Sequence, residues 1–457
     1  MEKNLTTGSV LKTVLYFSLP YLLSYFLQTL YGMADLFIIG QFNGVESTTA
    51  VSIGSQVMHM LTVMIVGLAM GATVMIGQAV GANQKEQASH AIGNTILLFM
   101  TLSLVLTLLL LLFVRPIVQV MATPIESVSG AIAYLTICFI GIPFITAYNI
   151  ISSILRGMGD SKSPMYFVAL SCLANILLDY LFIGLLGMGA AGAALGTTLS
   201  QTLSVLFALC LLLRKKAKIQ IPLSFKELRP RKSILLGLLK VGVPVALQDG
   251  FIQISFIVIT IFANQRGLND AAAVGIVEKI IGVLFLVPSS MLQSVSALCA
   301  QNIGAGRHER ARLILYYASA MAILWGAAAV ILMQLDAERF IGWFSDNQTV
   351  VLLGGQYMRG YVWDCILAGI HFSFSGYFCA YGWSGISFLH NSLSIVCARI
   401  PLSYFASRYF TNTLFPMGLA SSVGSGVSVL ICVGVFLWLN QRQQKQQRQE
   451  KQQSLAG

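Results

Sequence analysis

Two aspartates interrupt otherwise apolar stretches in the first half of this 457-residue chain. Asp35 lies in the stretch LQTLYGMADLFIIG, and Asp179 lies in ANILLDYLFIG. Asn175 comes four residues before Asp179, so a helix would place both side chains on one face. An ionisable group inside a bilayer costs at least about 2.5–3.5 kcal/mol, so it usually has a function or a partner. We therefore expect these residues to carry chemistry.

The residue types are suited to holding a proton or a small hard cation. Two carboxylates that face each other would not both stay ionised at low cost, so they would share one proton or recruit Na⁺. The amide of Asn175 and the hydroxyl of Thr197, in the next apolar stretch, would supply further oxygen ligands. In the alternative interpretation, Asp35 ends its helix near the outer face and Asp179 has only a structural role.

The second half of the chain carries its own charged residues at membrane depth, namely Asp249, Glu278 and Arg399. The two acids would form a second proton site or bind a cationic substrate. Alternatively, Arg399 neutralises one of them in a buried pair, which is the interpretation we favour. A further acid, Asp364, is expected near the outer end of its span.

The elements that position these residues are membrane-spanning helices. Hydrophobic residues make up 56% of the chain and charged residues only 10%, with a mean hydropathy of +0.78. Soluble domains carry about a quarter charged residues, so most of this surface must face lipid. Apolar runs of roughly 20 residues predict twelve spans. These are 14–38, 53–78, 92–114, 131–153, 164–186, 191–213, 235–263, 272–300, 312–334, 354–380, 385–407 and 416–439.

An internal repeat divides the chain into two halves of six spans. The segment GQAVGANQKEQASHA after residue 76 resembles AQNIGAGRHERARLI after residue 299, which aligns Gly81 with Gly304 at an offset of 223. Nearly the same offset aligns Pro20 with Pro244. Six spans are an even number, so both halves enter the membrane from the same side. Parallel repeats of this kind hold substrate near mid-membrane between the halves, and rocking alternates access.

The repeat gives the expected domain organisation. The chain should contain an N-terminus (1–13), an N-lobe (14–213), a basic linker (214–233), a C-lobe (234–440) and a Gln-rich tail (441–457). Two further predictions concern single residues. Pro20 removes a backbone hydrogen bond from the first span and should kink it. Arg399 occupies the repeat position of Asn175, and a guanidinium there should repel Na⁺ and silence the second lobe as a coupling site.

The basic residues indicate orientation. Most of the 28 Lys and Arg residues fall in the loops on the side of the N-terminus, in the 214–233 linker and in the tail. This bias predicts a bacterial inner (plasma) membrane protein with both termini in the cytoplasm. Because topology explains the positive charge, we expect no nucleic-acid partner. The scattered histidines and cysteines show no metal-ligand spacing and are expected to pack.

The combined motifs resemble the multidrug and toxic compound extrusion (MATE) family. The similarity rests on FSLPYLLSYFLQTLYGMADLFIIG, GQAVGA, LRGMGDSKSP and ANILLDYLFIG, and it extends over all twelve spans. It implies an all-α fold of two pseudo-twofold-related six-helix bundles around a V-shaped central cleft. It also implies multidrug efflux, in which an ion-coupled antiporter exports amphipathic or cationic compounds against H⁺ or Na⁺ and contributes to antibiotic resistance.

The resemblance also implies a set of site residues. The coupling-ion site of the family matches Asp35, Asn175, Asp179, Thr197 and Tyr134, with Na⁺ expected at the first three. The kinking proline matches Pro20, and polar cavity residues match Gln28 and Asn149. The second lobe does not reproduce the acids that NorM-like members place in spans seven and ten. The chain is therefore more similar to DinF-like members, whose coupling relies on the first lobe.

Other functions fit the sequence less well. A lipid-linked oligosaccharide flippase of the same broader superfamily is the main alternative, but such proteins tend to have more spans and a strongly cationic cavity. An enzyme is not expected, because the chain has neither an HExxH nor a GxSxG motif. We expect a monomer without cofactors, with membrane lipid and small amphipathic or cationic substrates as its partners.

Overall fold

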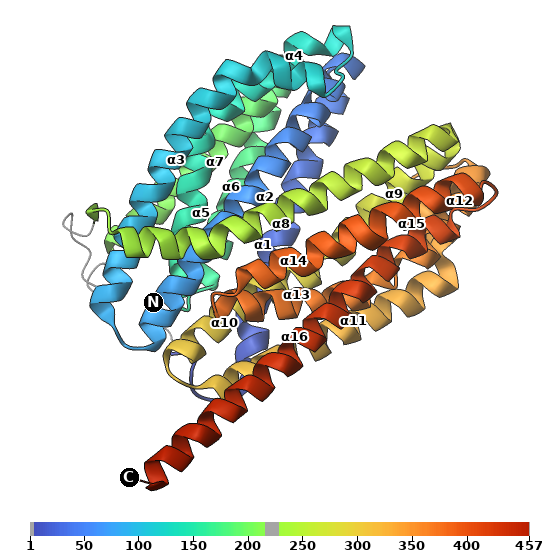
Figure 1. The fold of residues 1–457 in the computed structure, drawn as a ribbon. Helices are drawn as coiled ribbons and strands as arrows, with labels where there is room; N and C mark the ends of the chain where they lie inside the picture. The colour runs from blue at the N-terminus through green and yellow to red at the C-terminus, as the bar shows by residue number, and fades with distance from the viewer. Residues whose placement is uncertain (1–3, 215–227, 457) are drawn as a thin grey trace. The chain divides into compact units, whose positions relative to one another are not determined.

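The computed structural model describes residues 4–214 and 228–456, and in this part of the chain all regular structure is helical (Figure 1). The predicted basic linker lies mostly outside the described residues. The first half contains α1 (Val10–Phe42), α2 (Val45–Gly81), α3 (Lys85–Val120), α4 (Ile125–Ile140), α5 (Ile142–Gly157), α6 (Lys162–Asp179), η1 (Tyr180–Leu185) and α7 (Gly189–Arg214).

The second half repeats this order with more interruptions. It contains α8 (Lys232–Arg266), α9 (Leu268–Leu284), α10 (Leu286–Gly304), α11 (His308–Gly342), α12 (Gln348–Tyr361), α13 (Asp364–Ala380), α14 (Ser384–Ser394), η4 (Ile395–Arg399), α15 (Ile400–Tyr409) and α16 (Phe415–Ala456). The backbone of the Gln-rich tail continues α16. The prediction of an all-α, multi-pass membrane fold is confirmed.

All twelve predicted spans lie within these helices. In the described part of the chain, nine stretches are long and apolar enough to cross a membrane, among them α6 with η1 and α9 with α10, and α4 with α5 forms a tenth that bends by 47°. The remaining two spans correspond to α12–α13 and to α14–η4–α15, where no single helix reaches 18 residues.

The bend between α4 and α5 has a local cause. Pro143 lies in the first turn of α5, where it lacks an N–H donor and disfavours helical geometry in the preceding residue. Gly141 occupies the joint, and a Cβ atom there would lie 2.6 Å from Cγ2 of Thr198 on α7. The helix therefore bends where α7 passes close to its backbone.

Two compact units emerge from the packing, and they do not coincide with the two sequence repeats. Unit 1 comprises Met1–Gly250, Ser290–Ala318 and Gly376–Gly385, and unit 2 comprises Phe251–Ser289, Ser319–Ser375 and Ile386–Gly457. Unit 1 thus holds the first repeat together with one end of several helices from the second repeat. Its core is apolar and includes Ile76, Leu155 and Phe167, and the core of unit 2 includes Ile259, Met358 and Tyr361.

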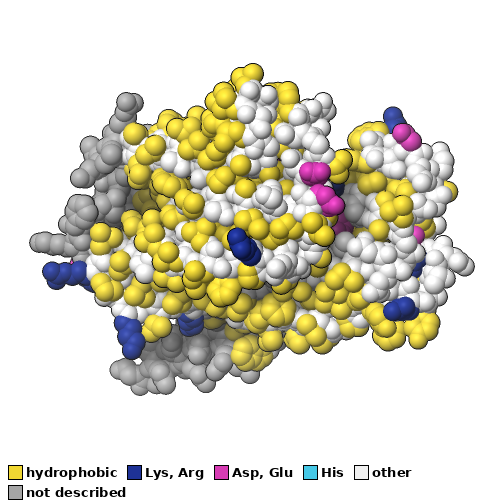
Figure 2. All heavy atoms as spheres, turned by 90° about the horizontal axis from the view of Figure 1, so that it is seen from above, with side chains coloured by type: hydrophobic (Ala, Val, Ile, Leu, Met, Phe, Trp, Pro, Cys, Tyr) yellow, Lys and Arg dark blue, Asp and Glu magenta, His cyan; other side chains and the backbone are white. Residues whose placement is uncertain are grey.

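The surface matches a lipid environment. Many large apolar side chains are exposed along the helices, among them Leu112, Leu324 and Leu430. The face drawn in Figure 2 is dominated by hydrophobic and uncharged side chains, with only a few acidic or basic ones. Exposed apolar area on this scale would be costly in water and is expected of helices that contact acyl chains.

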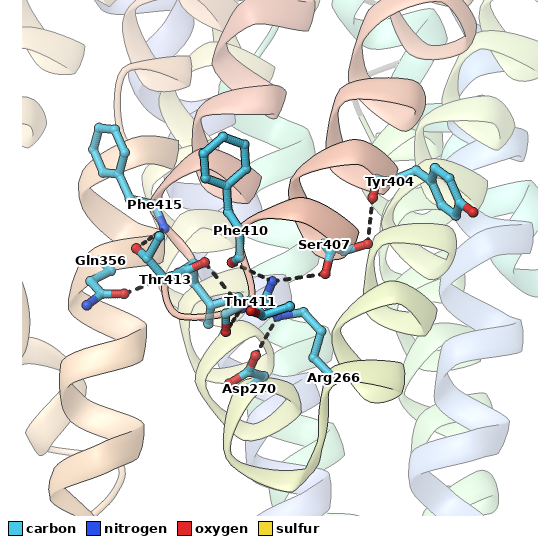
Figure 3. Close-up of polar contacts among 10 residues, drawn as sticks. Arg266, Asp270, Gln356, Tyr404, Ser407, Phe410, Thr411, Thr413 and Phe415 are labelled. Atoms are coloured by element: carbon cyan, nitrogen blue, oxygen red, sulfur yellow. Dashed lines mark hydrogen bonds and ion pairs between the residues drawn. The ribbon is translucent and has the colours of Figure 1, made fainter.

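In unit 2, Arg266 at the end of α8 clamps the loop that follows α15 (Figure 3). Its Nε donates to Asp270 Oδ2 at 2.5 Å, and Nη1 donates to the carbonyl oxygens of Ser407 and Phe410 at 3.2 and 3.0 Å. Nη2 donates to the carbonyls of Thr411 and Thr413 at 3.0 and 3.2 Å. The planar guanidinium therefore satisfies four carbonyls at a helix end that would otherwise lack partners.

Replacing Arg266 with alanine should lower the free energy of unfolding by about 2–4 kcal/mol, because four carbonyl acceptors and Asp270 would lose their donor. Arg266→Lys should recover only part of the loss, because an ammonium lacks the fork geometry. Thermal unfolding in detergent would measure both changes. Arg408→Ala is the matched control, since that exposed side chain only lies over the Tyr404 ring at 5.7 Å. Equal effects at the two positions would refute the clamp.

Candidate ion-coupling site

In unit 1, four polar side chains from α1, α6 and α7 come together in the first repeat. Thr197 Oγ1 donates to Asp35 Oδ2 at 3.2 Å. The side chains of Asp179 and Asn175 also interact with the Asp35 carboxyl. The exposed fractions of Asp35, Asp179 and Asn175 are 6%, 0% and 1%. The structure thus places these four sequence-predicted residues in one buried cluster.

This cluster is short of donors. Both carboxyl oxygens of Asp179, Oδ1 of Asp35 and both amide atoms of Asn175 are buried without a hydrogen-bond partner. Neither aspartate has an ion pair with a basic side chain among the described residues. Two ionised carboxylates can only accept hydrogen bonds, and leaving them unpaired in the interior is costly. One bound proton or one small cation would satisfy them together.

The backbone around Asp179 is irregular. Asp179 ends α6, and the next six residues form a π-helix, η1. Segments of this type are rare and often lie at functional sites. In the second repeat another π-helix, η4, ends at Arg399. Sequence periodicity does not reveal a one-residue change in helical repeat, so neither feature was predicted.

Gly196 is a site residue that the sequence analysis missed. It precedes Thr197 on α7, and a Cβ atom at Gly196 would lie 2.1 Å from Oδ1 of Asp179. The missing side chain is therefore what allows the Asp179 carboxyl to reach its position beside α7. A glycine within a run of small residues, GAAGAALG, gives no sign of this role in the sequence.

Substituting Gly196 with alanine should reduce ion-coupled transport by at least about tenfold, because a misplacement of about 1 Å in a positioned group has large effects. The added methyl group would force the Asp179 carboxyl away from Asp35. Gly32→Ala on α1 is a suitable control, since nothing lies within 4 Å of a Cβ atom at that position. Wild-type transport rates for Gly196→Ala would show that the position of Asp179 is unimportant.

Tyr134 on α4 lies beside this cluster. Its ring packs on Gly54 of α2, where a Cβ atom would be 2.3 Å from the ring. Tyr134 is buried and close enough to interact with Asp35 and Cys138. Tyr134 therefore borders the cluster. Like Gly196, Gly54 has no side chain that would collide with a residue of the site.

The remaining residues that the first repeat was expected to contribute lie elsewhere on its helices. α1 continues through Pro20, whose carbonyl oxygen accepts a hydrogen bond from Ser24 Oγ at 2.7 Å. Gln28 is half-buried on the same helix. Asn149 on α5 is buried and donates to the carbonyl of Ile145 in its own helix at 2.8 Å. None of these contacts connects them to Asp35.

In unit 2, Arg399 does not form the ion pair that the sequence analysis favoured. Its Nη2 donates to the Tyr361 hydroxyl at 2.6 Å, and its Cζ lies 4.6 Å from the centroid of the Phe256 ring. Among the described residues, no carboxylate oxygen lies within 4.0 Å of the guanidinium. The guanidinium instead lies against the rings of Phe256 and Tyr361.

Two acids still lie in the vicinity of this guanidinium. Glu278 accepts a hydrogen bond from Thr260 Oγ1 at 3.3 Å, and both Glu278 and Asp364 are close enough to Arg399 for electrostatic attraction. Asp364, expected near the outer end of its span, begins α13 and is only 1% exposed. We refer to Glu278, Asp364 and Arg399 as the second-repeat charged group. It contains two acids and one base.

Asp249 belongs to unit 1 and is described separately from that group. An added Cβ atom at Gly67 of α2 would lie 2.9 Å from Asp249 Oδ2. Tyr25 of α1 is close to Asp249, Tyr148 and Gln293. Tyr25 thus lies beside a carboxylate that has no ion pair among the described residues.

One further expectation changes, and one agrees with the structure. Arg156 follows the predicted span 131–153 and was therefore expected in a loop, but it is buried with its Cζ 4.5 Å from the centroid of the Tyr21 ring. The long side chain can place its charge over an aromatic face. His371 and His390 pack with ring centroids 5.7 Å apart, although their spacing in the sequence is unremarkable. His390 contacts the hydroxyl of Ser375 at 3.0 Å, which agrees with a packing role.

Comparison with known proteins identifies relatives along nearly the whole chain. A family model described as MatE matches residues 20–181 and again residues 244–405, once in each repeat. The probable multidrug resistance protein YoeA of Bacillus subtilis is 26% identical over 441 residues, which cover 95% of each chain. The multidrug export protein MepA of Staphylococcus saprophyticus is 24% identical over 375 residues, 82% of each chain.

Solved structures share the fold. A MOP superfamily transporter from Pyrococcus furiosus aligns with a TM-score of 0.88 at 24% identity, covering 96% of this chain and 97% of the other. A MATE structure in the straight conformation gives the same TM-score, identity and coverage. At this identity the likeness shows the fold alone, and the chemistry rests on the residues described above.

Proposed function

Because the chain belongs to the MatE family, we propose that it exports multiple amphipathic or cationic compounds by antiport against inward H⁺ or Na⁺. The coupling ion binds in the first repeat, at Asp35, Asn175, Asp179 and Thr197, with Tyr134 beside it. The family consists of transporters, so no enzymatic step is involved. The names of YoeA and MepA, a multidrug resistance protein and a multidrug export protein, support this class of substrate.

One observation carries the proposal, namely that two aspartates face each other in the protein interior without a basic partner among the described residues. A buried pair of this kind cannot keep two negative charges cheaply. Its charge must change when the cluster exchanges ions with water. Binding of an ion and access to one side of the membrane can therefore be linked at this point.

Asp249 is the group we assign to cationic substrates. Its carboxylate lies beside Tyr25 of α1 and against the backbone of α2 at Gly67. Aromatic faces attract organic cations, and an unpaired carboxylate supplies the balancing charge. Gln28 and Asn149 are retained as polar cavity residues of the first repeat. The second-repeat charged group contains its own base, and it is not needed for coupling.

Purified protein in proteoliposomes, with each ion gradient imposed separately, tests the function. Efflux of a fluorescent organic cation should be accelerated by a pH gradient or by a Na⁺ gradient, and the effective gradient identifies the coupling ion. The membrane potential is clamped in both experiments so that the two ions are compared at equal driving force. Equal efflux with and without either gradient would contradict antiport.

If the protein were a flippase, the same vesicles would give a different result. A labelled lipid-linked oligosaccharide would then change leaflets, while the organic cation would remain inside whatever gradient is imposed. Orientation is tested separately by protease access to tags at the two ends. Both tags should be protected in right-side-out vesicles, because the basic loops place both termini in the cytoplasm.

A further inference from the structure

The repeated motif that revealed the two halves, GQAVGA and AQNIGA, forms a reciprocal contact within unit 1. Gln78 Nε2, in the first copy, donates to the carbonyl oxygen of Ala380 at 2.8 Å. Gln301 Nε2, in the second copy, donates to the carbonyl oxygen of Gly157 at 2.9 Å. By the repeat offset of 223, Gln78 is equivalent to Gln301 and Gly157 is equivalent to Ala380. The two bonds are therefore symmetry equivalents, and each crosses from one repeat to the other.

Both accepting carbonyls belong to helix ends. Gly157 is the last residue of α5, and Ala380 is the last residue of α13. The carbonyls in the final turn of a helix have no partner within that helix. Each glutamine thus caps a helix of the other repeat, so separation of the repeats would leave two carbonyls and two amides without partners.

The helix backbones that carry the glutamines are in close contact. A Cβ atom at Gly81 would lie 1.9 Å from the carbonyl oxygen of Gln301, and one at Gly304 would lie 2.0 Å from that of Gln78. A Cβ atom at Gly77 would be 3.1 Å from the Cβ of Ala300. Small residues spaced by four allow such an approach between membrane helices. The contact between α2 and α10 has no room for gradual adjustment.

The two segments that precede the repeats make a second pair of reciprocal contacts. Arg307 and Arg310, at the start of α11, donate to the carbonyls of Thr6 and Gly8 at 2.5 and 2.7 Å, which ties the N-terminal segment to the second repeat. Conversely, the N–H of Arg231, just before α8, donates to Asn94 Oδ1 on α3 of the first repeat at 2.7 Å. The segment that precedes each repeat is therefore held by a helix of the other one.

We propose that this reciprocal contact, which we call the glutamine latch, is a gate that must open and close in every transport cycle, with Gln78 and Gln301 as its positioning residues. The proposal rests on the proposed function, since it assumes alternating access by movement of the repeats. The latch lies at the end of the helices that the basic residues place in the cytoplasm. While it is closed, the repeats cannot part on that side. Its strength therefore sets the balance between the two access states.

Disulfide cross-linking tests whether the latch opens. Gly77→Cys and Ala300→Cys are introduced together after the eight native cysteines have been replaced, because Cys299 adjoins the site. The predicted Cβ separation is close to that of disulfides. Oxidation should reduce cation efflux at least about tenfold, and reduction should restore it. The control pair, Ala50→Cys with Gly130→Cys, has a comparable 3.0 Å separation within the first repeat and should leave efflux unchanged.

Alkylation of a reporter cysteine tests the glutamines. Ala297→Cys is placed in the buried seam of α10, where its carbonyl is 3.7 Å from a Cβ atom at Gly77. Gln78→Leu and Gln301→Leu should each raise the alkylation rate from the cytoplasmic side about threefold to tenfold, the change expected from one lost hydrogen bond. Gln334→Leu is the control, because Gln334 donates to the Arg359 carbonyl at 2.8 Å within the second repeat and should have no effect.

The outcomes separate the latch from the proposed function. Undiminished efflux by a fully cross-linked latch pair would show that the contact never opens and would overturn the proposal. So would a latch pair that fails to cross-link when the control pair does, or equal alkylation in all three glutamine variants. If the cysteine-free protein exports nothing under either gradient, the proposed function fails, while the alkylation rates of Ala297→Cys in the glutamine variants still report on the latch.

Discussion

Replacing Asp35 with asparagine should abolish gradient-driven efflux, with a loss of at least about a hundredfold, and should leave the protein folded. The substitution keeps the shape of the side chain and the contact with Thr197 Oγ1 but removes the charge that faces Asp179. Without that charge the cluster has only one carboxyl, so a bound proton or cation no longer relieves repulsion between two. Efflux from proteoliposomes under each gradient provides the measurement.

The matched control for this experiment is Asp160→Asn. Asp160 is also buried in the first repeat, but its Oδ1 accepts the N–H of Ser163 at 3.0 Å at the start of α6. Asparagine serves nearly as well as aspartate in that role, so efflux should remain close to the wild-type rate. Substrate binding by Asp35→Asn should persist, because the cation is assigned to Asp249. Wild-type efflux by Asp35→Asn would place the coupling site elsewhere.

The sequence was sufficient to predict the spans and the repeat, for a physical reason. A helix that crosses the lipid needs about twenty apolar residues, so the hydropathy pattern alone located all twelve spans. Two of these spans consist of shorter helices in succession, α12–α13 and α14–η4–α15. The grouping of Asp35 with Asp179 could also be anticipated. A carboxylate in an apolar helix needs a partner, and few polar residues were available.

Other features depend on contacts that a linear pattern does not contain. The importance of Gly196 comes from the approach of Asp179 on another helix, and the π-helix η1 changes the helical repeat by one residue. Arg399 was correctly placed inside the protein, but its direct partner proved to be the Tyr361 hydroxyl. Charge alone suggested a carboxylate, whereas the geometry of an aromatic pocket determined the contact.

The division into two compact units also depends on contacts that the linear sequence pattern does not contain. The repeat predicted two lobes, and each motif copy was assigned to its own lobe. In the structure, most of α10, the first part of α8 and one end each of α11 and α13 belong to the compact unit that contains the first repeat. The hydrogen bonds of Gln78 and Gln301 are among the contacts that join the two repeats within this unit, because each glutamine caps a helix of the opposite repeat. A motif that appears twice in a sequence can therefore mark a contact between the copies.

Removing Arg399 should destabilise the protein by about 3–5 kcal/mol, the cost of leaving buried charges without compensation. Arg399→Met retains apolar volume between Phe256 and Tyr361 but withdraws the positive charge near Glu278 and Asp364. Glu278→Gln in the same chain should restore much of the loss, because the group would then hold one acid instead of two. Thermal unfolding of the two single variants and the double variant gives the coupling energy.

This double-mutant cycle should yield a coupling of about 1–3 kcal/mol, although no direct ion pair exists, because attraction through an apolar interior is weakly screened. Glu338→Gln is the control partner. Its carboxylate is held by Arg359 at 2.6 Å, so its effect should add to that of Arg399→Met without coupling. Strict additivity with Glu278→Gln as well would mean that Arg399 interacts with its aromatic neighbours alone. Glu278 would then be free to bind an ion, and the second repeat would have to be considered as a coupling site.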